Sequence, residues 1–287
     1  MRVVIIYNPN STGNGKANAE RLANALRDES IEVRLRQTTH PGHATEIADS
    51  YARRGDEMVL ISSSGDGGYH ELINGVLCHK NTKLVVGLLP SGNANDHYSS
   101  LNSGDMAHAI ISRKFRTIDT LKVSGTIKGA EWLRYAHSYA GIGVTAVAAK
   151  KLIEDRPNAW SEKWTVLHSL LSFRYAKVIE DGDTRRYSSL ILSNIPTMSK
   201  VIKLSQQSSV YDGKFEVNAI HFGSKLRLIG YLMTAALIGL HHDASQSRYK
   251  CRTTKPLAIQ LDGEVYTLDA DSTLVVESDR RSLRCVL

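Results

Sequence analysis

The residues with the clearest potential for ligand binding or catalysis lie in a loop rich in glycine and serine, residues 62–74 (SSSGDGGYHELIN). The apolar run 58–61 before it predicts a buried strand, and the apolar spacing after it predicts a helix. Glycines let backbone N–H groups approach an anion closely, and a helix N-terminus adds its positive dipole end. The loop could therefore hold a phosphate. Asp66 could then bind a metal ion or take part in a proton transfer. An ordinary turn, in which Asp66 caps the helix, is the alternative.

A second loop of similar composition is residues 8–16 (NPNSTGNGK), again between an expected strand and an expected helix. Its backbone amides and the hydroxyl of Ser11 could hold a phosphate that Lys16 neutralises. The spacing is not that of a P-loop, which is therefore excluded. A turn that merely uses proline, asparagine and glycine is the alternative.

Polar side chains also follow two other expected strands. Thr38 closes the run 32–37, where either a nucleotide contact or a helix boundary is expected. Residues 89–96 (LPSGNAND) follow an apolar run, and they supply the short polar side chains of Asn93, Asn95 and Asp96. A turn with a helix cap is the alternative for this stretch. Since ligands of parallel sheets bind at the carboxyl ends of the strands, all these loops lie where a ligand is expected.

The first 120 residues alternate strand and helix, which predicts an α/β domain with a doubly wound parallel sheet. Closely spaced strands predict a β-rich domain, an antiparallel sheet or sandwich, over residues 121–287. The strands expected there are 116–123, 133–143, 187–193, 215–222, 250–260, 264–268, 273–277 and 283–287, and the helices are 145–178 and 226–240. The last strand could return to the first domain. The active site is expected in the cleft between the domains.

Two Asp-Gly pairs stand between apolar runs in the second half, at 211–217 (YDGKFEV) and 261–266 (LDGEVY). Asp-Gly in this setting is a strong hairpin signal, which suffices to explain both. In the second pair, Glu264 is a carboxylate beside a tight turn, where a general base could stand. It would be catalytic only if the fold brought it close to Asp66.

Composition excludes several classes of protein. With 42% hydrophobic and 23% charged residues, the chain of 287 residues is an ordinary globular protein. The net charge of +7 suits an anionic partner, but the basic residues are scattered and no nucleic-acid-binding module is found, so nucleic acid is not an expected partner. Three widely spaced cysteines favour a reducing compartment. No apolar run reaches the roughly 20 residues of a membrane span.

Taken in order, these motifs resemble the diacylglycerol kinase catalytic-domain family, whose bacterial lipid kinases are similar to sphingosine kinases. The family patterns NPxSGxGK, GGDGTxxExxNG, LPxGTxND, DGx(L/F)xV and a late DGE correspond to residues 8–16, 64–75, 89–96, 212–217 and 262–264. The resemblance runs from about residue 3 to residue 287. The ordered set is more specific than any single motif.

The resemblance implies an NAD-kinase-like α/β domain that binds the nucleotide, followed by a β-sandwich that binds the acceptor. The implied activity is that of a lipid kinase, which uses ATP and Mg²⁺ to transfer the γ-phosphoryl group to a lipid hydroxyl such as that of diacylglycerol. The implied location is cytoplasmic and peripheral on the inner membrane face, with a lipid alcohol and an anionic membrane surface as partners. An edge strand of the second domain could also pair two copies into a homodimer.

The resemblance also assigns residues by position. The nucleotide site would comprise Asn8, Ser11, Lys16, Thr38, Ser64, Gly65, Asp66, Gly67, Gly68, Tyr69, His70, Glu71, Asn93, Asn95 and Asp96. Glu264 would be the base that takes the lipid hydroxyl proton, and Asp66 would be catalytic beside the Mg²⁺ that accompanies ATP. A second, structural Mg²⁺ would be bound by Asp212 and by backbone carbonyls near Ser209 and Lys214.

The sequence departs from the family at several points. Gly68 and Asn93 stand where the family has threonines, Ser64 stands where it has a glycine, and Tyr211 replaces a carboxylate beside the structural metal site. Two alternatives to a lipid kinase follow. The same fold could serve a soluble acceptor, in the manner of NAD kinases, or the chain could be a catalytically impaired homologue that binds a nucleotide or a lipid.

Overall fold

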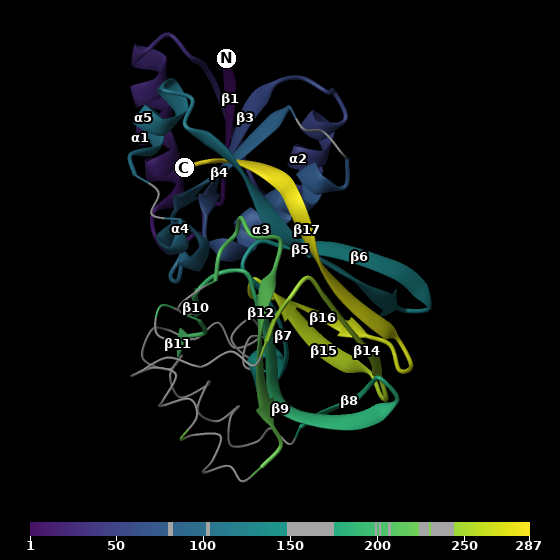
Figure 1. Cartoon of the computed structure of the whole chain (residues 1–287). Coiled ribbons are helices and arrows are strands. Elements are labelled where there is room, and N and C mark those ends of the chain that lie inside the picture. Colours follow the sequence, from purple (N-terminus) through teal and green to yellow (C-terminus); the bar gives the residue numbers. More distant parts are fainter. Residues whose placement is uncertain are drawn as a thin grey trace. The chain divides into compact units, whose positions relative to one another are not determined.

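The computed structural model describes residues 1–79, 83–101, 104–147, 175–198, 200, 202–205, 208–223, 230 and 244–287. They form two compact units (Figure 1). Unit 1 comprises Met1–Thr120 and Arg280–Leu287, and unit 2 comprises Leu121–Asp279. Two long strands, β5 (Phe115–Ile127) and β17 (Thr273–Val286), have residues in both units.

Unit 1 contains the parallel sheet that the sequence predicts. Its strands β1 (Arg2–Tyr7), β2 (Glu32–Gln37), β3 (Met58–Ser64) and β4 (Leu84–Pro90) pair in parallel in the order β2-β1-β3-β4. Cys285 of β17 extends the sheet by pairing in parallel with Val86 of β4. The helices are α1 (Gly15–Asp28), α2 (His43–Ala52), α3 (Asp66–Leu77), α4 (Asp96–Ser100) and α5 (Met106–Ile111).

The core of unit 1 shows why these segments fold as they do. β3 is buried along its whole length, so its apolar run needs no alternation with polar residues. α1 buries Ala19, Leu22 and Leu26 on one face, and this face packs with Val3 and Ile5 of β1. Complete burial of one leucine, as at Leu26, stabilises the fold by about 2 kcal/mol.

Unit 2 is the β-rich part of the chain, and its strand pairs are antiparallel. Its strands are β6 (Ala130–Ala136), β7 (Tyr139–Gly143), β8 (Ala176–Glu180), β9 (Asp183–Ser193), β10 (Thr197–Met198), β11 (Ile202–Lys203), β12 (Phe215–His221), β13 (Ala244–Gln246), β14 (Arg248–Thr253), β15 (Leu257–Leu261) and β16 (Glu264–Leu268). β9 lies between β7 and β12, and β15 joins β7 to β16. The buried core of the unit includes Leu192, Phe215 and Ile259.

Four expected strands are divided or joined in the structure. The strand expected at 133–143 is divided into β6 and β7, because the backbone N–H groups of His137 and Ser138 donate to the Asp262 carboxylate. The strand expected at 250–260 is divided into β14 and β15 near Pro256, which has no N–H to donate to a sheet. The segments expected at 273–277 and 283–287 form one continuous strand, β17.

Two expected helices fall largely outside the described residues. At the end of the helix expected at 145–178, residues 176–178 instead belong to β8, which a turn at Asp181 and Gly182 pairs with β9. Residues 148–174 of that helix lie outside the described residues, as does all of 226–240 except Gly230. Within the described ranges, no helix has both the length and the apolarity that a membrane span requires.

Candidate functional site

Three loops of unit 1 meet at the carboxyl edge of the parallel sheet, after β1, β3 and β4. The backbone N–H of Gly13 donates to the carbonyl of Ser91 over 2.9 Å. The N–H of Ser91 in turn donates to the carbonyl of Ser64 over 2.8 Å. The motifs at 8–16, 62–74 and 89–96 are therefore neighbours in space, at the edge where parallel sheets bind ligands.

Buried polar side chains tie the same loops together. The hydroxyl of Ser63 donates to the carbonyl of Gly15 over 2.7 Å and lies 3.2 Å from the hydroxyl of Ser91. Asn18 Nδ2 donates to the Ser91 hydroxyl and to the carbonyl of Gly13, each over 2.9 Å. Because these groups are hydrogen-bonded and shielded from water, they fix the spacing of the loops. The sequence analysis missed Ser63, Ser91 and Asn18; the serine run that ends the apolar segment before Gly65 was the available signal.

Two glycine contacts account for the composition of the 62–74 loop. A Cβ atom on Gly92 would overlap the Cα of Gly65, so the loops after β3 and β4 touch only because both residues are glycine. A Cβ atom on Gly68 would overlap the side chain of Ser64. The two departures from the family pattern, at 64 and 68, therefore lie side by side, and the serine occupies the space that a larger residue 68 would need. The Ser64 hydroxyl stays in the loop, 2.7 Å from that of Ser62.

The Asp66 carboxylate is directed to the start of α4. It accepts the backbone N–H of Asp96 over 3.2 Å and that of His97 over 3.4 Å. A carboxylate at a helix N-terminus is stabilised by the free N–H groups and by the helix dipole. The capping role considered as an alternative for Asp66 is thus present, at α4 rather than at α3.

Several other predicted residues have structural partners of their own. Glu71 accepts the N–H of Gly42 over 2.8 Å and that of Ala44 over 3.2 Å, so it caps the N-terminus of α2. The side chains of Tyr69 and His70 are each 1% exposed. Neither residue therefore presents its side chain to a ligand at the loop.

In the loop of residues 8–16, some polar groups are hydrogen-bonded within the loop and others are accessible to solvent. Ser11 donates its hydroxyl to the carbonyl of Asn8 over 3.0 Å and accepts the N–H of Gly15 over 2.9 Å. Lys16 extends into solvent, where its Nζ lies 3.8 Å from Glu20. Thr38, at the end of β2, donates its N–H to the carbonyl of Tyr7 over 3.0 Å, which keeps it beside β1. Of these groups, the Lys16 ammonium is the most available to an anion.

The side chain of Asn95 closes the loop after β4 by hydrogen bonding to Gly92. Asn95 accepts the N–H of Gly92 over 3.0 Å and donates to its carbonyl over 2.9 Å, with a left-handed φ of 53°. Asp96, which begins α4, is buried, and Asn93 is exposed. Of the three residues predicted here, Asn93, Asn95 and Asp96, Asn93 is therefore the one whose side chain can contact a bound molecule.

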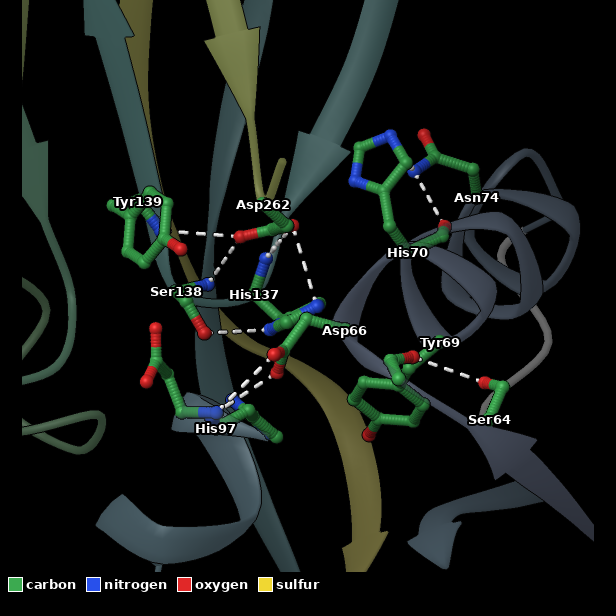
Figure 2. A network of polar contacts seen from close by, with 12 residues as sticks. Ser64, Asp66, Tyr69, His70, Asn74, His97, His137, Ser138, Tyr139 and Asp262 are labelled. Atoms are coloured by element: carbon green, nitrogen blue, oxygen red, sulfur yellow. Dashed lines mark hydrogen bonds and ion pairs between the residues drawn. The ribbon is translucent and has the colours of Figure 1, made fainter. Parts of the chain in front are cut away.

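In unit 2, Asp262, which Figure 2 shows among its partners His137, Ser138 and Tyr139, lies in the turn before Glu264. Asp262 Oδ1 accepts the N–H of Ser138 over 2.9 Å and that of Tyr139 over 3.1 Å, and Oδ2 accepts the N–H of His137 over 2.9 Å. His137 Nε2 lies 3.4 Å from Oδ2, and both side chains are 0% exposed. The sequence analysis treated the Asp-Gly pair as a hairpin signal and missed this role of its aspartate.

Glu264 is the first residue of β16 and pairs with Leu261 across the two-residue turn. The turn residues Asp262 and Gly263 have φ of 51° and 99°, the left-handed values that such a hairpin needs. Glu264 is half-buried. Burial raises the pKa of the nearby Tyr266 to about 12. The positive charge of Arg134 opposes this increase, and the negative charge of Glu264 adds a smaller increase. Asp66 and Glu264 belong to different units, and their meeting in one site stays a prediction.

The residues expected to hold a structural Mg²⁺ lie in one turn before β12. The hydroxyl of Ser209 accepts the N–H of Tyr211 over 3.3 Å, and Asp212 Oδ1 accepts the N–H of Lys214 over 2.9 Å. Asp212 is exposed, and among the described residues only its Oδ1 accepts a hydrogen bond. A carboxylate with neighbouring backbone carbonyls is the hard oxygen donor set that Mg²⁺ prefers.

Comparison with known proteins points to one family. Residues 2–123 match the model of the diacylglycerol kinase catalytic domain. Over 156 residues the chain is 28% identical to a candidate lipid kinase of Staphylococcus aureus (strain MRSA252), with 51% of this chain and 48% of that protein covered. Over 102 residues it is 32% identical to a candidate YegS-like lipid kinase of Klebsiella pneumoniae (strain 342), with 35% and 34% covered. The chain thus matches half or less of the length of these curated relatives.

Solved structures share the fold over nearly the whole chain. A structure described as a diacylglycerol kinase of Bacillus anthracis (strain Sterne) matches with a TM-score of 0.72 and 16% identity, covering 99% of this chain and 96% of that chain. Yeast NADH kinase in complex with NADH matches with a TM-score of 0.52 and 11% identity, covering 100% and 83%. Residues 2–123 therefore resemble the diacylglycerol kinase catalytic domain, and the chain has the fold of diacylglycerol and NADH kinases.

Proposed function

We propose that this protein is a kinase that transfers the γ-phosphoryl group of ATP to a lipid hydroxyl such as that of diacylglycerol. The observation that carries the proposal is the meeting of three glycine-containing loops at one edge of a parallel sheet. The match to the diacylglycerol kinase catalytic domain covers all three loops.

The ATP phosphates would bind to the backbone of residues 65–68 and to the start of α3. These glycines have no side chains to cover their N–H groups, and α3 begins at Asp66, so its free N–H groups add to the binding. Lys16 would neutralise part of the phosphate charge, and Asn93 would contact the nucleotide. Positioning and charge neutralisation provide most of the rate enhancement in phosphoryl transfer.

Mg²⁺ bound with ATP neutralises charge on the phosphate oxygens, and Asp66 would be the residue closest to it. Asp212, with the carbonyls near Ser209 and Lys214, would hold the structural Mg²⁺ of unit 2. Glu264 would accept the proton of the acceptor hydroxyl, a role worth about 10²–10⁴ in rate. The buried Asp262 would keep Glu264 in place by fixing its turn.

A kinase of a more polar, soluble acceptor is the second candidate, and one observation favours it. Asn218 on β12 is 0% exposed, and neither its Oδ1 nor its Nδ2 has a hydrogen-bond partner in the part of the chain that the structure describes. The hydroxyls of Ser189 and Ser193 on the adjacent strand β9 are buried and lack partners there too. Buried polar groups without partners are costly, and an acceptor rich in hydroxyl groups would satisfy them where its binding exposes these side chains.

As a lipid kinase, the protein would act in the cytoplasm, peripherally on an anionic inner membrane face. The exposed Arg185 and Arg186 of β9, with Arg113, Lys114 and Arg116, supply positive charge for that contact. A homodimer formed through an edge strand of unit 2 belongs to the same proposal.

The test is Mg²⁺-dependent transfer of labelled phosphate from ATP to diacylglycerol, sphingoid bases, monoacylglycerol and polyprenols in mixed micelles, and to soluble alcohols without detergent. Glu264→Gln and Asp66→Asn are the variants, and Glu131→Gln, an exposed glutamate of β6, is the matched control. Labelled lipid that disappears in both variants but not in the control supports the lipid kinase. Label in a soluble alcohol alone favours the second candidate. ATP binding without any labelled product would contradict both and leave a binding homologue.

A further inference from the structure

A pocket of about 250 Å³ lies at the amino edge of the parallel sheet in unit 1, opposite the loops described above. Its apolar wall comes from Met58 and Val59 at the start of β3 and from Val85 of β4. Strands of six or seven residues, at about 3.3 Å per residue, separate the two edges of the sheet by roughly 20 Å. The pocket is therefore a separate site from the nucleotide loops.

Three arginines line this pocket, against one carboxylate, that of Glu57. Arg2 is paired with Asp56 at 3.0 Å. Arg284 lies over the ring of Phe115, 5.4 Å from its centroid. Within the described ranges, the guanidinium groups of Arg113 and Arg284 have neither a hydrogen bond nor an ion pair. With Arg2 paired and one carboxylate in the lining, the two other guanidinium groups leave the site net positive, and a concave site of positive charge attracts an anion.

The backbone at Arg113 supports a role for its side chain. The N–H of Arg113 donates to the carbonyl of Ile110, and that of Lys114 to the carbonyl of Ala109, which is the Schellman arrangement at the end of α5. The residue in the position of Arg113 is usually glycine because φ is left-handed there, and Arg113 has φ of 52°. The chain thus carries a long, charged side chain at a position that favours glycine. Here the side chain lines the pocket.

We infer that this pocket binds a small phosphomonoester with a short carbon chain next to the phosphate. Arginine is suited to this ligand because its planar fork of donors matches two phosphate oxygens. The apolar wall of Met58, Val59 and Val85 would contact the carbon part of the ligand. The phosphomonoester could be a free metabolite or the headgroup of a phosphorylated lipid, since the recognised chemistry is the same. The inference rests on unit 1 alone and holds whatever acceptor the kinase uses.

The experiment is a calorimetric titration of the full chain with glycerol 3-phosphate, and with inorganic phosphate as the reference anion. The variants are Arg113→Asn, which suits the left-handed backbone, and Arg284→Gln. Each loses one charge-assisted contact, so each is expected to bind about tenfold more weakly, and the double variant is expected not to bind. Arg21→Gln, on the exposed face of α1, removes the same charge outside the pocket and should leave the affinity unchanged. Thermal unfolding of each variant confirms that it is folded.

A second arm measures sedimentation with phosphatidylcholine vesicles with and without phosphatidic acid. Binding to phosphatidic acid alone, lost in the double variant, supports the inference and identifies a lipid headgroup as the source. Saturable binding of glycerol 3-phosphate, lost in the double variant, supports a free metabolite. Absence of binding in both arms, or binding that the double variant retains, overturns the inference. Lys16→Gln should leave pocket binding intact, and kinase activity is assayed separately, so failure of one proposal is not failure of the other.

Discussion

The imidazole of His137 and the carboxylate of Asp262 form a fully buried contact, with Nε2 and Oδ2 3.4 Å apart. The residues are 125 positions apart in the chain, and the contact joins the start of β7 to the β15–β16 turn. His137 is also fixed from its other side, because its Nδ1 lies 2.7 Å from the hydroxyl of Ser138. The turn that carries Glu264 is thus held in place by the Asp262 carboxylate. From the sequence pattern, only a role in hairpin formation is predicted for this residue.

Asp262→Asn is expected to destabilise the protein by about 3 kcal/mol, because an amide NH₂ replaces the oxygen that accepts the buried N–H of His137. The free energy of unfolding, measured in urea, tests this. Asp269→Asn is the matched control, since Asp269 accepts the N–H groups of Lys128 and Gly129 in an exposed turn. Equal losses in the two variants would contradict a special role for the buried carboxylate.

Gly68→Thr is expected to cost about 2 kcal/mol of stability and to weaken ATP binding, because the new side chain overlaps Ser64. Ser64→Gly should remove the obstacle, so the double variant should recover most of both losses. Thermal unfolding and ATP titration of the two single variants and the double variant measure the coupling. Additive losses would show that Ser64 and Gly68 are not a paired exchange.

Of the three free cysteines, Cys78 alone is exposed, and it is expected to be the thiol that reacts in the folded protein. Burial raises the pKa of Cys251 to about 12 and that of Cys285 to about 12, so both remain protonated and shielded at pH 8. Burial, followed by the hydrogen bond to Asp49, also raises the pKa of Cys78, so its alkylation should be slow. Mass spectrometry after iodoacetamide treatment at pH 8 measures this. Early modification of Cys285 would contradict the burial of β17.

Asp49 is expected to make stability depend on acid pH. The hydrogen bond from His79 lowers the pKa of Asp49, burial opposes this, and Arg53 adds to the lowering. A lowered folded-state pKa means that the contribution is present above the unfolded pKa of about 4 and is lost as the pH falls through the folded value. Asp49→Asn should therefore lower the melting temperature near pH 7, with a difference that shrinks below about pH 4. Asp28→Asn, an exposed carboxylate at the end of α1, should show no such trend.

Much of unit 1 could be predicted because its signals are local. Apolar runs followed by glycine loops fix β1, β3 and β4, and parallel pairing then brings their ends to one edge. The buried bonds of Asn18 and Ser91 could not be predicted, since they join positions that only the fold makes neighbours. In unit 2 the break between β6 and β7 escaped prediction for the same reason, because the acceptor that replaces a strand partner comes from Asp262.

The return of β17 to unit 1 has a consequence for the order in which the chain is made. Its last residues close the sheet beside β4, where Cys285 pairs with Val86, and Arg281 donates its N–H to Asp119 over 2.7 Å. Until these residues leave the ribosome, β4 has no neighbour on this side. Its unpaired edge can then associate with other chains. Although its first 120 residues are synthesised early, unit 1 can complete its fold only when translation of β17 is finished, after all of unit 2 has emerged.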